Sequence, residues 1–404
     1  MINACIIGVS GFGRVHYTDL MKQVEAGRMR VVAATVINEP EEPEKCAKLR
    51  SVGAKIFTDS DEMFREFAGK ADLCFIPTGI SFHEPMSIAA MRAGMNVYVE
   101  KPAAATIQEV RNMQAVERET GKFVAVGFQD AFSDDTVNLK HRLVSGEFGK
   151  IKRVAVQVAW PRASKYYERN WWAGRLRARD RWILDSPFNN ATAHYITLMC
   201  FFAGAEFREA ARLATVQAEL HRAKPIESPD TAAIRAITED GIPLLYLGTH
   251  SCREYFGPDI RIETENASIV WQREAIVITN NDGATERLPL NEDLREPVMR
   301  HLMERVTNPH EFICSLDIAA VHTLYVNGAH ESSDIHVIPA EHTVTTEGEE
   351  GTLIAVDRME QIIHDCYESE LLFSEAGVPW AKTSAPVDVR NYNEFTGGAI
   401  GTEK

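Results

Sequence analysis

A glycine-rich turn over residues 8–13 offers the first candidate chemistry in this sequence. It lies between a short apolar run and an amphipathic segment, where glycine lets the backbone approach a pyrophosphate at a helix N-terminus. Gly8 and Gly13 occupy the first and third positions of a G-x-G-x-x-G fingerprint, Ser10 occupies the second, and Gly11 can supply the close approach instead. A tight turn without a ligand would also need glycine. The position of residues 8–13 between a strand and a helix of an alternating series favours a dinucleotide-binding turn.

The region after the second expected strand bears on which dinucleotide is preferred. An acid at the end of that strand normally binds the ribose hydroxyls, but Val36 stands nearest to that place and Asn38 follows. No Lys or Arg occurs between Val31 and Lys45, whereas four glutamates do: Glu39, Glu41, Glu42 and Glu44. Because these carboxylates would repel a 2′-phosphate, NAD is expected rather than NADP.

Lys101 is the next residue that could do chemistry, because it follows an apolar run over residues 96–99 and Glu100. Open parallel sheets bind ligands at the carboxyl ends of their strands, and Pro102 restrains the chain after the lysine. Beside a cationic nicotinamide, a lysine is suited to acid–base work near neutrality. The alternative is a surface lysine at a strand end, and the pattern favours the functional role.

Asn190 and His194 form a second candidate pair, because residues four apart lie on one face of a helix and a helical pattern covers them. Asn189 or Asn190 is suited to cap the start of that helix. The other helix face is apolar and predicts core packing: Ile196, Met199, Cys200 and Ala203. Asp185 and Asp180 offer an alternative pair of carboxylates, but an Asp before Ser-Pro is more typical of a turn.

An aromatic and basic stretch extends from Trp160 to Trp182 in an otherwise acidic chain. Its members are Trp160, Arg162, Lys165, Tyr166, Tyr167, Arg169, Trp171, Trp172, Arg175, Arg177, Arg179, Arg181 and Trp182. Aromatic faces and Arg donors suit a carbohydrate, including a carboxylated one, with Arg162, Trp171 and Trp172 as candidate contacts. Since Trp, Tyr and Arg are also enriched in subunit interfaces, a subunit-contact arm is an equally good interpretation.

Alternating strand and helix patterns over the first 128 residues indicate how the first candidate residues are positioned. Apolar runs predict strands at 4–8, 30–36, 55–57, 71–76, 96–99 and 123–128, and helical patterns cover 14–26, 41–51, 60–67, 82–93 and 106–120. This alternation predicts a doubly wound parallel sheet covered on both faces. We therefore expect a dinucleotide-binding Rossmann domain over residues 1–128.

After residue 128 the pattern changes to long strands flanked by helices. Helices are expected at 133–145, 190–203, 294–306, 316–330 and 355–373, and strands at 150–160, 209–221, 231–238, 243–250, 260–264, 268–272, 274–279 and 285–290. These elements predict an α+β domain over residues 129–380, with a large, mostly antiparallel, open-faced sheet that binds substrate and joins subunits. Residues 381–404 form a tail, in which residues 397–401 are expected to be poorly ordered.

Several motifs together resemble the Gfo/Idh/MocA family, the nicotinamide enzymes that include glucose–fructose oxidoreductase and inositol dehydrogenase. The motifs are Gly13-Arg14-Val15-His16, Thr78 followed by His83, Ala93-Gly94, Val99-Glu100-Lys101-Pro102, Val126-Gly127-Phe128-Gln129 and residues 146–151. The resemblance covers residues 1–205 and is only architectural beyond them. It implies a Rossmann domain followed by a substrate domain, and an NAD(P)-dependent dehydrogenase that acts on CH–OH groups.

The resemblance also implies roles for the matching residues. Lys101 would contact the nicotinamide and the reacting hydroxyl, and His194 would act on the substrate hydroxyl. The implied cofactor contacts are Gly8, Ser10, Gly11, Phe12, Gly13, Asn38, Thr78, His83, Glu100, Lys101 and Gln129, and the implied substrate contacts are Lys101, Gln129, Arg162, Trp171, Trp172, Asn190 and His194. The family commonly has Asp where Asn190 stands, and an amide can orient an imidazole but cannot stabilise an imidazolium by charge.

The sequence therefore predicts an NAD-dependent oxidoreductase for a secondary hydroxyl of a sugar, polyol or sugar acid. Lys101 and His194 would handle the proton, while Asn190 and Gln129 would position the substrate. Two alternatives stay open. One is an NAD-binding regulator that senses a sugar without turnover, which the asparagine at position 190 keeps open, and the other is a redox-assisted glycoside-cleaving enzyme with tightly bound NAD.

Composition narrows the partners of the chain. Its 404 residues, 45% hydrophobic and 25% charged, describe a soluble protein of two domains. The net charge of −15 argues against nucleic acid and against an anionic membrane surface. No apolar run approaches the ~20 residues that span a bilayer, and the first residues lack the basic region and cleavage site of a signal peptide.

The cysteine pattern indicates the compartment. The 7 cysteines are scattered, with no C-x-x-C pair, as buried reduced thiols are. We therefore expect a cytoplasmic protein. No His, Cys or Asp set has metal-ligand spacing, so no metal is expected.

The strands of the second domain also suggest assembly. Apolar residues occupy both alternations in places, such as residues 244–247 and 275–278, so a monomer would expose an apolar sheet face. A homodimer or homotetramer through this sheet is therefore expected. The competing interpretation is that the 161–188 stretch or the C-terminal segment covers the sheet within one chain.

Overall fold

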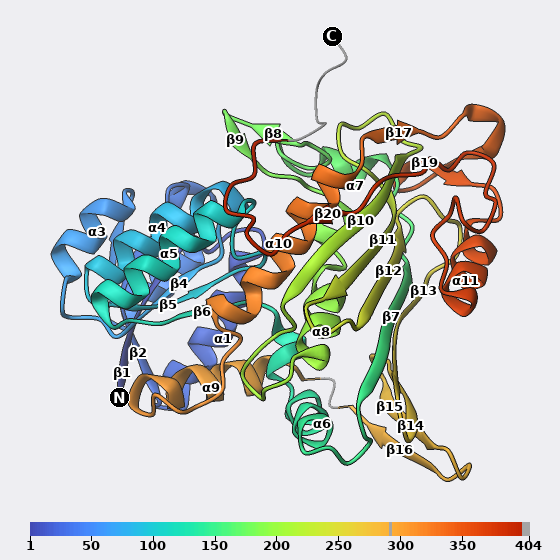
Figure 1. The fold of residues 1–404 in the computed structure, drawn as a ribbon. Helices are drawn as coiled ribbons and strands as arrows, with labels where there is room; N and C mark the ends of the chain where they lie inside the picture. The colour runs from blue at the N-terminus through green and yellow to red at the C-terminus, as the bar shows by residue number, and fades with distance from the viewer. Residues whose placement is uncertain (291–292, 398–404) are drawn as a thin grey trace. The chain divides into compact units, whose positions relative to one another are not determined.

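The first six strands form one parallel sheet in the order β3-β2-β1-β4-β5-β6 (Figure 1). The computed structural model describes residues 1–290 and 293–397. The strands are β1 (Ile2–Ile7), β2 (Met29–Thr35), β3 (Lys55–Phe57), β4 (Leu73–Ile76), β5 (Asn96–Val99) and β6 (Val124–Val126). The helices between them are α1 (Gly13–Glu25), α2 (Pro43–Ser51), α3 (Ser60–Phe67), α4 (His83–Arg92) and α5 (Ile107–Thr120). The predicted Rossmann sheet is confirmed.

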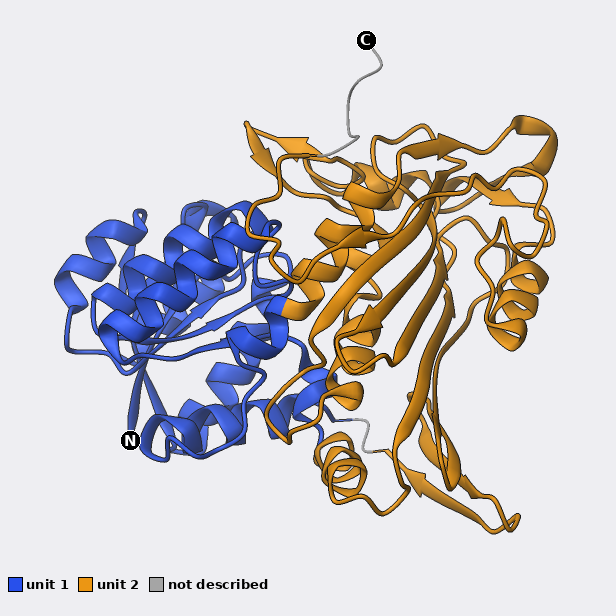
Figure 2. Cartoon of the chain, viewed as in Figure 1, with its two compact units in different colours: residues 1–133, 293–320 blue, residues 134–292, 321–404 orange. Residues whose placement is uncertain are grey.

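Two compact units make up the chain, and their boundaries differ from the expected 1–128, 129–380 and 381–404. One unit is Met1–Ser133 with Asp293–Ala320, and the other is Asp134–Glu292 with Val321–Lys404 (Figure 2). Helix α9 (Arg295–Thr307) therefore belongs to the Rossmann unit. The backbone N–H of Val126 on β6 donates to the carbonyl of Cys314 at 2.8 Å, so the segment after α9 extends the edge of the parallel sheet.

The second unit is built on a mixed sheet in the order β16-β15-β14-β13-β7-β12-β11-β10-β17, with β20 paired to β10. Only β7–β12 and β10–β17 pair in parallel, so the predicted mostly antiparallel sheet is confirmed. The strands are β7 (Ile151–Ala159), β10 (Leu213–Arg222), β11 (Thr231–Thr238), β12 (Pro243–Thr249), β13 (Phe256–Thr264), β14 (Ala267–Trp271), β15 (Ala275–Asn280), β16 (Thr285–Pro289), β17 (Ile335–Val337) and β20 (Val387–Asp388).

Smaller elements complete this unit. The helices are α6 (Asp134–Val144), α7 (Ser164–Glu168), α8 (Ala193–Ala203), α10 (Leu316–Ser332, which begins in the first unit) and α11 (Met359–Ser369). Two hairpins lie outside the sheet, one from β8 (Arg177–Ala178) and β9 (Arg181–Trp182) and one from β18 (Thr343–Gly348) and β19 (Gly351–Val356). The sequence pattern did not predict β8, β9 or the strands from β17 onward. Most of these strands are short or largely polar, but β19 is apolar and its last residues fall within the helix expected at 355–373.

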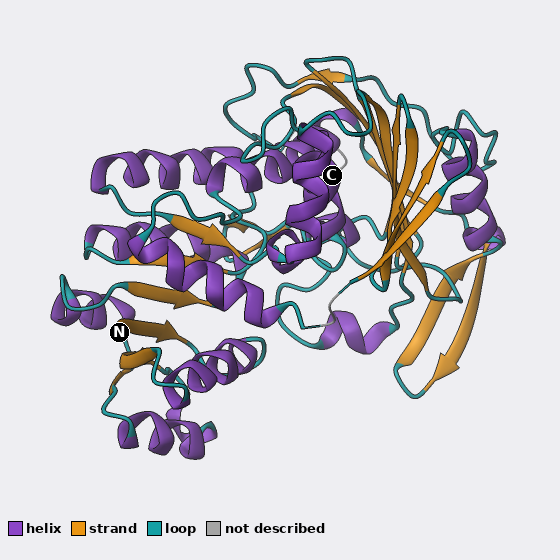
Figure 3. Cartoon of the chain, turned by 90° about the horizontal axis from the view of Figure 1, so that it is seen from below, coloured by secondary structure: helices purple, strands orange, loops and turns teal. Residues whose placement is uncertain are grey.

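Helix α11 covers one face of the mixed sheet, opposite the face that packs on α8 (Figures 1 and 3). Apolar sheet residues on that face, such as Ala155, Leu245 and Leu247, share a buried cluster with α11 and the chain after it. The helix and that following segment contribute Met359, Ile363, Cys366, Tyr367, Leu372, Phe373 and Trp380. The C-terminal segment thus covers this face over β7, β11 and β12, as the competing interpretation held for that part of the sheet.

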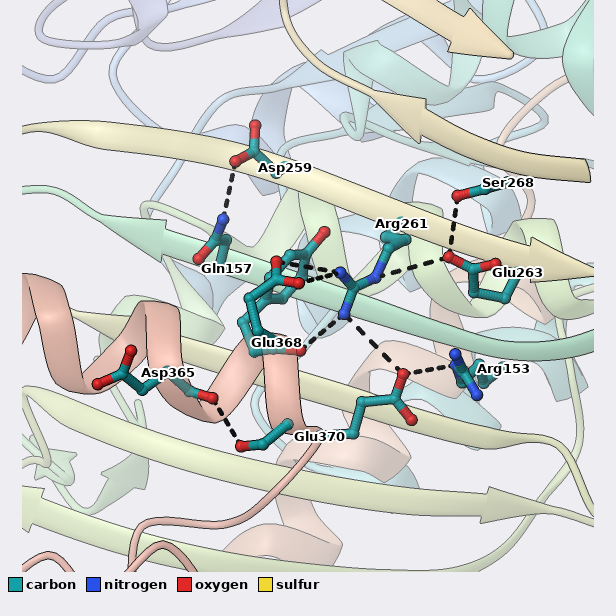
Figure 4. A network of polar contacts seen from close by, with 11 residues as sticks. Arg153, Gln157, Asp259, Arg261, Glu263, Ser268, Asp365, Glu368 and Glu370 are labelled. Carbon is teal, nitrogen blue, oxygen red and sulfur yellow. Dashed lines mark hydrogen bonds and ion pairs between the residues drawn. The ribbon is translucent and has the colours of Figure 1, made fainter. Parts of the chain in front are cut away.

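Ion pairs fasten this cover at its polar border (Figure 4). Arg261 on β13 contacts Glu368 of α11 at 3.0 Å, and Arg153 on β7 contacts Glu370 at 2.5 Å. The Arg261 guanidinium also lies over the Tyr367 ring, 4.2 Å from its centre. A partner that needed the bare sheet would have to displace both the apolar cluster and these charged contacts.

Three further expectations can be compared with the described residues. All seven cysteines are buried free thiols, as expected. None of the helices in residues 1–290 and 293–397 is long and apolar enough to cross a membrane. The expected poor order of residues 397–401 falls almost wholly on positions outside the described part of the chain.

We expect acid to destabilise this unit through His221 on β10. The side chain is 0% exposed and its ring packs 4.9 Å from that of Trp380. Burial lowers the pKa of His221 to about 3, whereas the unfolded chain takes up a proton near pH 6.5. The contribution of neutral His221 to the free energy of unfolding is therefore fully present above pH 6.5. It falls as the pH drops below 6.5, by about 2 kcal/mol between pH 7 and pH 5.

Urea unfolding at pH 7 and pH 5 measures this dependence. His221→Phe should reduce the pH-dependent loss, and His364→Gln on the exposed side of α11 should leave it unchanged. An equal loss in wild type and His221→Phe would contradict the assignment.

Candidate active site

The glycine-rich turn follows β1, which lies between β2 and β4 where the strand order reverses. Gly8 and Gly11 have positive φ values of +88° and +53°, and a Cβ at either would meet nothing within 4 Å. A Cβ at Gly13 would lie 2.8 Å from the Gly8 carbonyl oxygen, so only glycine allows α1 to start this close to the strand. These open, side-chain-free positions at a helix N-terminus fit a pyrophosphate.

Ser10 and Asn38 are brought together beside this turn. The Asn38 Nδ2 atom donates to Ser10 Oγ at 3.0 Å and to Glu41 Oε2 at 3.0 Å. Val36 is fully buried and Ile37 is 82% exposed, so neither replaces the acid that usually binds ribose hydroxyls. Ser10 and Asn38 are thus the polar groups that the turn and the β2 end place together.

Lys45 is a cation that the sequence pattern did not place at this corner. Its Nζ atom donates to the carbonyl oxygen of Val9 at 2.9 Å and contacts Glu42 Oε2 at 2.5 Å. The hydrogen bond from Lys45 is the largest of the effects that lower the pKa of Glu42. The ionised carboxylate offsets the lysine charge next to the turn.

Glu100 at the end of β5 forms a buried ion pair with His16 of α1, at 2.6 Å between Oε1 and Nε2. Burial alone would raise the pKa of Glu100, but the His16 hydrogen bond and the charges of His16, Lys101 and Arg295 outweigh it and leave the pKa at about 2. The other carboxylate oxygen accepts the backbone N–H of Lys101 at 3.2 Å. Glu100 therefore connects α1 to the backbone from which Lys101 projects.

His83, Thr78 and Gln129 follow the ends of neighbouring strands in the same sheet. The His83 ring lies 2.8 Å from the Pro102 carbonyl oxygen and 3.1 Å from that of Thr78, and it is fully buried. Burial lowers the pKa of His83, which favours the neutral ring. A neutral imidazole donates to only one of these two carbonyl oxygens at a time. The ring links the end of β4 to the chain after Lys101. Gln129 starts the short turn after β6 and is half-buried.

His194 and Asn190 belong to the second unit, and their local structure differs from the prediction. Helix α8 begins at Ala193, so Asn190 lies before the helix and does not share its face with His194. Neither Asn189 nor Asn190 caps α8; its N-cap position is Thr192. Pro187 starts a separate 3-10 turn (Pro187–Asn189) that the Ser186 side chain caps, and this turn delays the helix.

Thr192 fixes the start of α8 against the sheet. Its Oγ1 atom lies 2.7 Å from the hydroxyl oxygen of Tyr246 on β12 and donates to the Pro187 carbonyl at 2.8 Å. A Cβ at Gly248 would lie 1.9 Å from that tyrosine oxygen, so glycine lets the ring cross the strand toward Thr192. His194, two residues later, is 8% exposed.

Asp185 is buried beside Asn190, whereas Asp180 is exposed in the β8–β9 turn. Asp185 is 3% exposed, accepts the Gly174 backbone N–H at 2.6 Å and accepts Asn190 Nδ2 at 2.8 Å. The residue does not start the turn, because Ser186 does so. The prediction that Asp185 starts the turn is therefore wrong.

The aromatic and basic stretch, residues 160–182, stacks its own arginines on its aromatic rings. Arg169 lies 3.6 Å from the Tyr166 ring centre and 5.3 Å from that of Trp172, and Arg179 lies 4.2 Å from that of Trp171. Arg162 is 5.0 Å from the Tyr166 ring centre. A sugar could therefore reach Trp171 and Trp172 only on the ring faces that these arginines leave open.

The same stretch lines a cavity of ≈ 1050 Å³ in the second unit. Its lining includes Tyr167, Asn170, Arg175, Arg222 and Lys224. Aromatic, amide and cationic groups around a cavity of this size suit a polar organic ligand such as a carbohydrate.

Residues 2–128 match a family model described as an oxidoreductase family with an NAD-binding Rossmann fold, Gfo/Idh/MocA. The glycine turn, Glu100 and Lys101 described above all lie within the matched residues.

Relatives and solved structures extend the comparison with the Gfo/Idh/MocA family. An inositol 2-dehydrogenase from Serratia proteamaculans is 29% identical over 150 residues, 37% of this chain and 43% of that protein. One from Azotobacter vinelandii is 26% identical over 220 residues, 52% of this chain and 61% of that protein. Each match spans less than two thirds of the relative's length.

The fold likeness extends over both units. A WlbA dehydrogenase from Bordetella pertussis, solved with NADH and UDP-GlcNAcA, aligns with a TM-score of 0.64 and 20% identity, covering 81% of this chain and 95% of that one. GenD2 from gentamicin A biosynthesis, solved with NAD, aligns with a TM-score of 0.61 and 16% identity, covering 81% of this chain and 93% of that one. At such identities, the likeness shows the fold alone.

The sequence reasoning missed several residues that hold these groups in place. His16 lies one turn after Gly13, so its spacing could have suggested a contact near the strand ends. Gly127 admits the Glu100 carboxylate, which a Cβ there would approach to 3.1 Å. Asp185 was considered only as part of a carboxylate pair or as a turn residue, and Gly248 was not considered at all, although Asn190 and Tyr246 lie only five and two residues from them in sequence.

We expect Glu100→Gln to lower the unfolding free energy at pH 7 by about 2–3 kcal/mol, because the buried charged hydrogen bond to His16 is lost. The folded pKa of about 2 lies below the ordinary 4.5. The carboxylate's contribution is therefore present above pH 4.5 and is lost as the pH falls toward 2. Urea unfolding from pH 7 to pH 3.5 should show the variant and wild type converging, with exposed Glu44→Gln as the control. A constant difference at all pH values would contradict this account.

Proposed function

We propose that this chain is an NAD-dependent oxidoreductase that acts on a secondary hydroxyl of a sugar, polyol or sugar acid. The observation that carries the proposal is the glycine cradle at the β1–α1 turn, in the same sheet whose β5 end presents Lys101. Inositol 2-dehydrogenases among the relatives, and a solved structure that holds NADH with UDP-GlcNAcA, support a carbohydrate-like substrate.

In this proposal, the residues of the two units divide the work. Gly8, Gly11 and Gly13 hold the pyrophosphate, and Ser10 with Asn38 contacts the adjacent ribose. When bound, NAD supplies the acceptor for the hydride that leaves the carbinol carbon. Lys101 and His194 handle the hydroxyl proton as the ketone forms, and one of them accepts it, so that two electrons leave with the hydride and one proton leaves through the protein.

Substrate contacts are proposed on both units. Gln129 follows β6 in the Rossmann unit, and Asn190 precedes α8 in the second unit. Arg162, Trp171 and Trp172 belong to the aromatic and basic stretch, but the ≈ 1050 Å³ cavity is lined by other members of it, such as Tyr167, Asn170 and Arg175. The mixed polar and aromatic lining supports a carbohydrate there.

A regulator that binds NAD and a sugar without turnover is the second candidate. Asn190 in place of the family's usual Asp favours it, since no carboxylate at that position stabilises a charged histidine. The retained Lys101 and His194 favour the enzyme. Turnover with any CH–OH substrate would exclude the pure regulator.

We expect Lys101→Ala to keep NAD binding and to lose at least ~10²-fold in kcat, because a well-placed acid–base group is removed while the phosphate cradle stays. Calorimetric titration measures the NAD affinity, and the absorbance of reduced nicotinamide measures turnover. Lys70→Ala, an exposed lysine of the same unit, should behave like wild type. Turnover near wild type in Lys101→Ala would reject the catalytic role.

NAD should bind at least ~10-fold more tightly than NADP, since four glutamates follow β2 and Glu42 neutralises Lys45. Glu42→Gln should narrow this ratio, because Lys45 would then offer an uncompensated charge to a 2′-phosphate. Glu44→Gln, exposed on α2, serves as the matched control. Equal or tighter binding of NADP to the wild type would contradict the assignment.

The expected cytoplasmic location and homo-oligomer remain predictions. Because α11 covers the sheet face, a dimer or tetramer would have to use the outer surface of α11 or another surface. Light scattering at micromolar concentration decides the state: a mass near 45.2 kDa refutes an oligomer.

A further inference from the structure

We propose that Asp185 is a positioning residue that supplies, through Asn190, the carboxylate that the family usually carries at position 190. The inference rests on the proposed function, because it concerns how Asn190 meets a substrate hydroxyl or an imidazole. It concerns only residues of the second unit. It also explains why this chain carries an amide at position 190.

Two segments converge on the Asp185 carboxylate. Asn190 Nδ2 donates to Oδ1 at 2.8 Å, and the Gly174 backbone N–H donates to Oδ2 at 2.6 Å. With 3% of its surface exposed, Asp185 is shielded from water. Hydrogen bonds to a buried carboxylate are strong and stabilise its ionised form.

This contact fixes the orientation of the Asn190 amide. An amide can face a carboxylate only with its Nδ2 donor, so its Oδ1 acceptor is turned to the opposite side. Asn190 thereby presents an oxygen acceptor of fixed direction, as an aspartate would. The negative charge lies on Asp185, its hydrogen-bond partner. An aspartate at 190 would instead put two carboxylates at hydrogen-bond distance, and they could not both be ionised.

The backbone before Asp185 is held in a strained conformation. Leu184 is buried and has a positive φ of 51°, which a branched apolar residue rarely adopts. The Asn189 side-chain amide donates to the carbonyls of Ile183 and Leu184, each at 3.1 Å. Such strain persists where the surroundings over-determine it, and here it sets the direction of Asp185.

Asp185 also connects Asn190 to the aromatic and basic stretch. Gly174 lies in that stretch and lines the ≈ 1050 Å³ cavity. The Asp185 backbone N–H donates in turn to the Arg175 carbonyl at 3.0 Å. Asp185 thus orients the Asn190 amide before α8 and also holds Gly174, which is part of the cavity wall.

A charge exchange tests the inference. Asp185→Asn and Asn190→Asp should each lower kcat at least ~10-fold, with the NAD affinity unchanged, because the positioned acceptor is lost. The double variant Asp185→Asn/Asn190→Asp re-forms one carboxylate and one amide, and it should recover kcat to within ~3-fold of wild type. Asp180→Asn, an exposed Asp of the same stretch, is the matched control.

Thermal unfolding of each variant, without substrate, separates folding from positioning. Asn190→Asp should lower the unfolding midpoint and the double variant should restore it. If Asp185→Asn does not fold, Asn190→Asp and the double variant still carry the comparison.

Two outcomes overturn the inference while the proposed function stands. One is an unchanged kcat in folded Asp185→Asn. The other is a double variant whose kcat falls by the product of the two single-variant losses. If the wild type transfers no hydride to NAD from any sugar, polyol or sugar acid, the proposed function fails, and the positioning role fails with it.

Discussion

A buried carboxylate at the end of β5 holds together the edge of the Rossmann sheet on which the candidate chemistry depends. Glu100 contacts His16 of α1 with one oxygen and the Lys101 backbone with the other. The charge is retained inside the protein because His16, Lys101 and Arg295 surround it. Gly127, directly after β6, has no side chain and therefore leaves room for the Glu100 carboxylate. The glycine turn and Lys101 are thereby set on one rigid frame.

The second unit uses a comparable arrangement around Asp185. There the carboxylate joins Asn190 to the 160–182 stretch, and the strained Leu184 backbone directs it. One face of the sheet packs on α11, whose apolar side contacts Leu245 and Leu247. Glu368 of α11 meets Arg261, and Glu370 just after the helix meets Arg153. The face over β7, β11 and β12 is therefore part of the core of this chain.

Periodicity and turn residues predicted what depends on neighbours in sequence. The parallel sheet, the helices of the Rossmann unit and the long antiparallel strands follow from such local patterns, and so do Gly8, Gly13 and Lys101 at strand ends. Contacts between distant segments were beyond that reasoning. The return of α9 to the Rossmann unit depends on packing against α1 and the turn Gln129–Phe132. The Lys45 contact with Val9 depends on how α2 folds back.

Asn190 shows the same limit within a short segment. Its spacing from His194 fits a helix, but Pro187 and the Ser186 cap form a separate turn first. The partner of Asn190 comes from Asp185, whose own position is set by Gly174 and Asn189. Only the assembled backbone shows that the Asn190 amide meets the Asp185 carboxylate.

Hydride transfer to NAD tests the central claim most directly. The purified protein is incubated with NAD and a panel of sugars, polyols and sugar acids, and the absorbance of reduced nicotinamide is followed. The account predicts that at least one CH–OH compound produces reduced nicotinamide together with the corresponding ketone. NAD that binds but stays oxidised with every member of the panel would contradict it and would favour a sugar-sensing regulator.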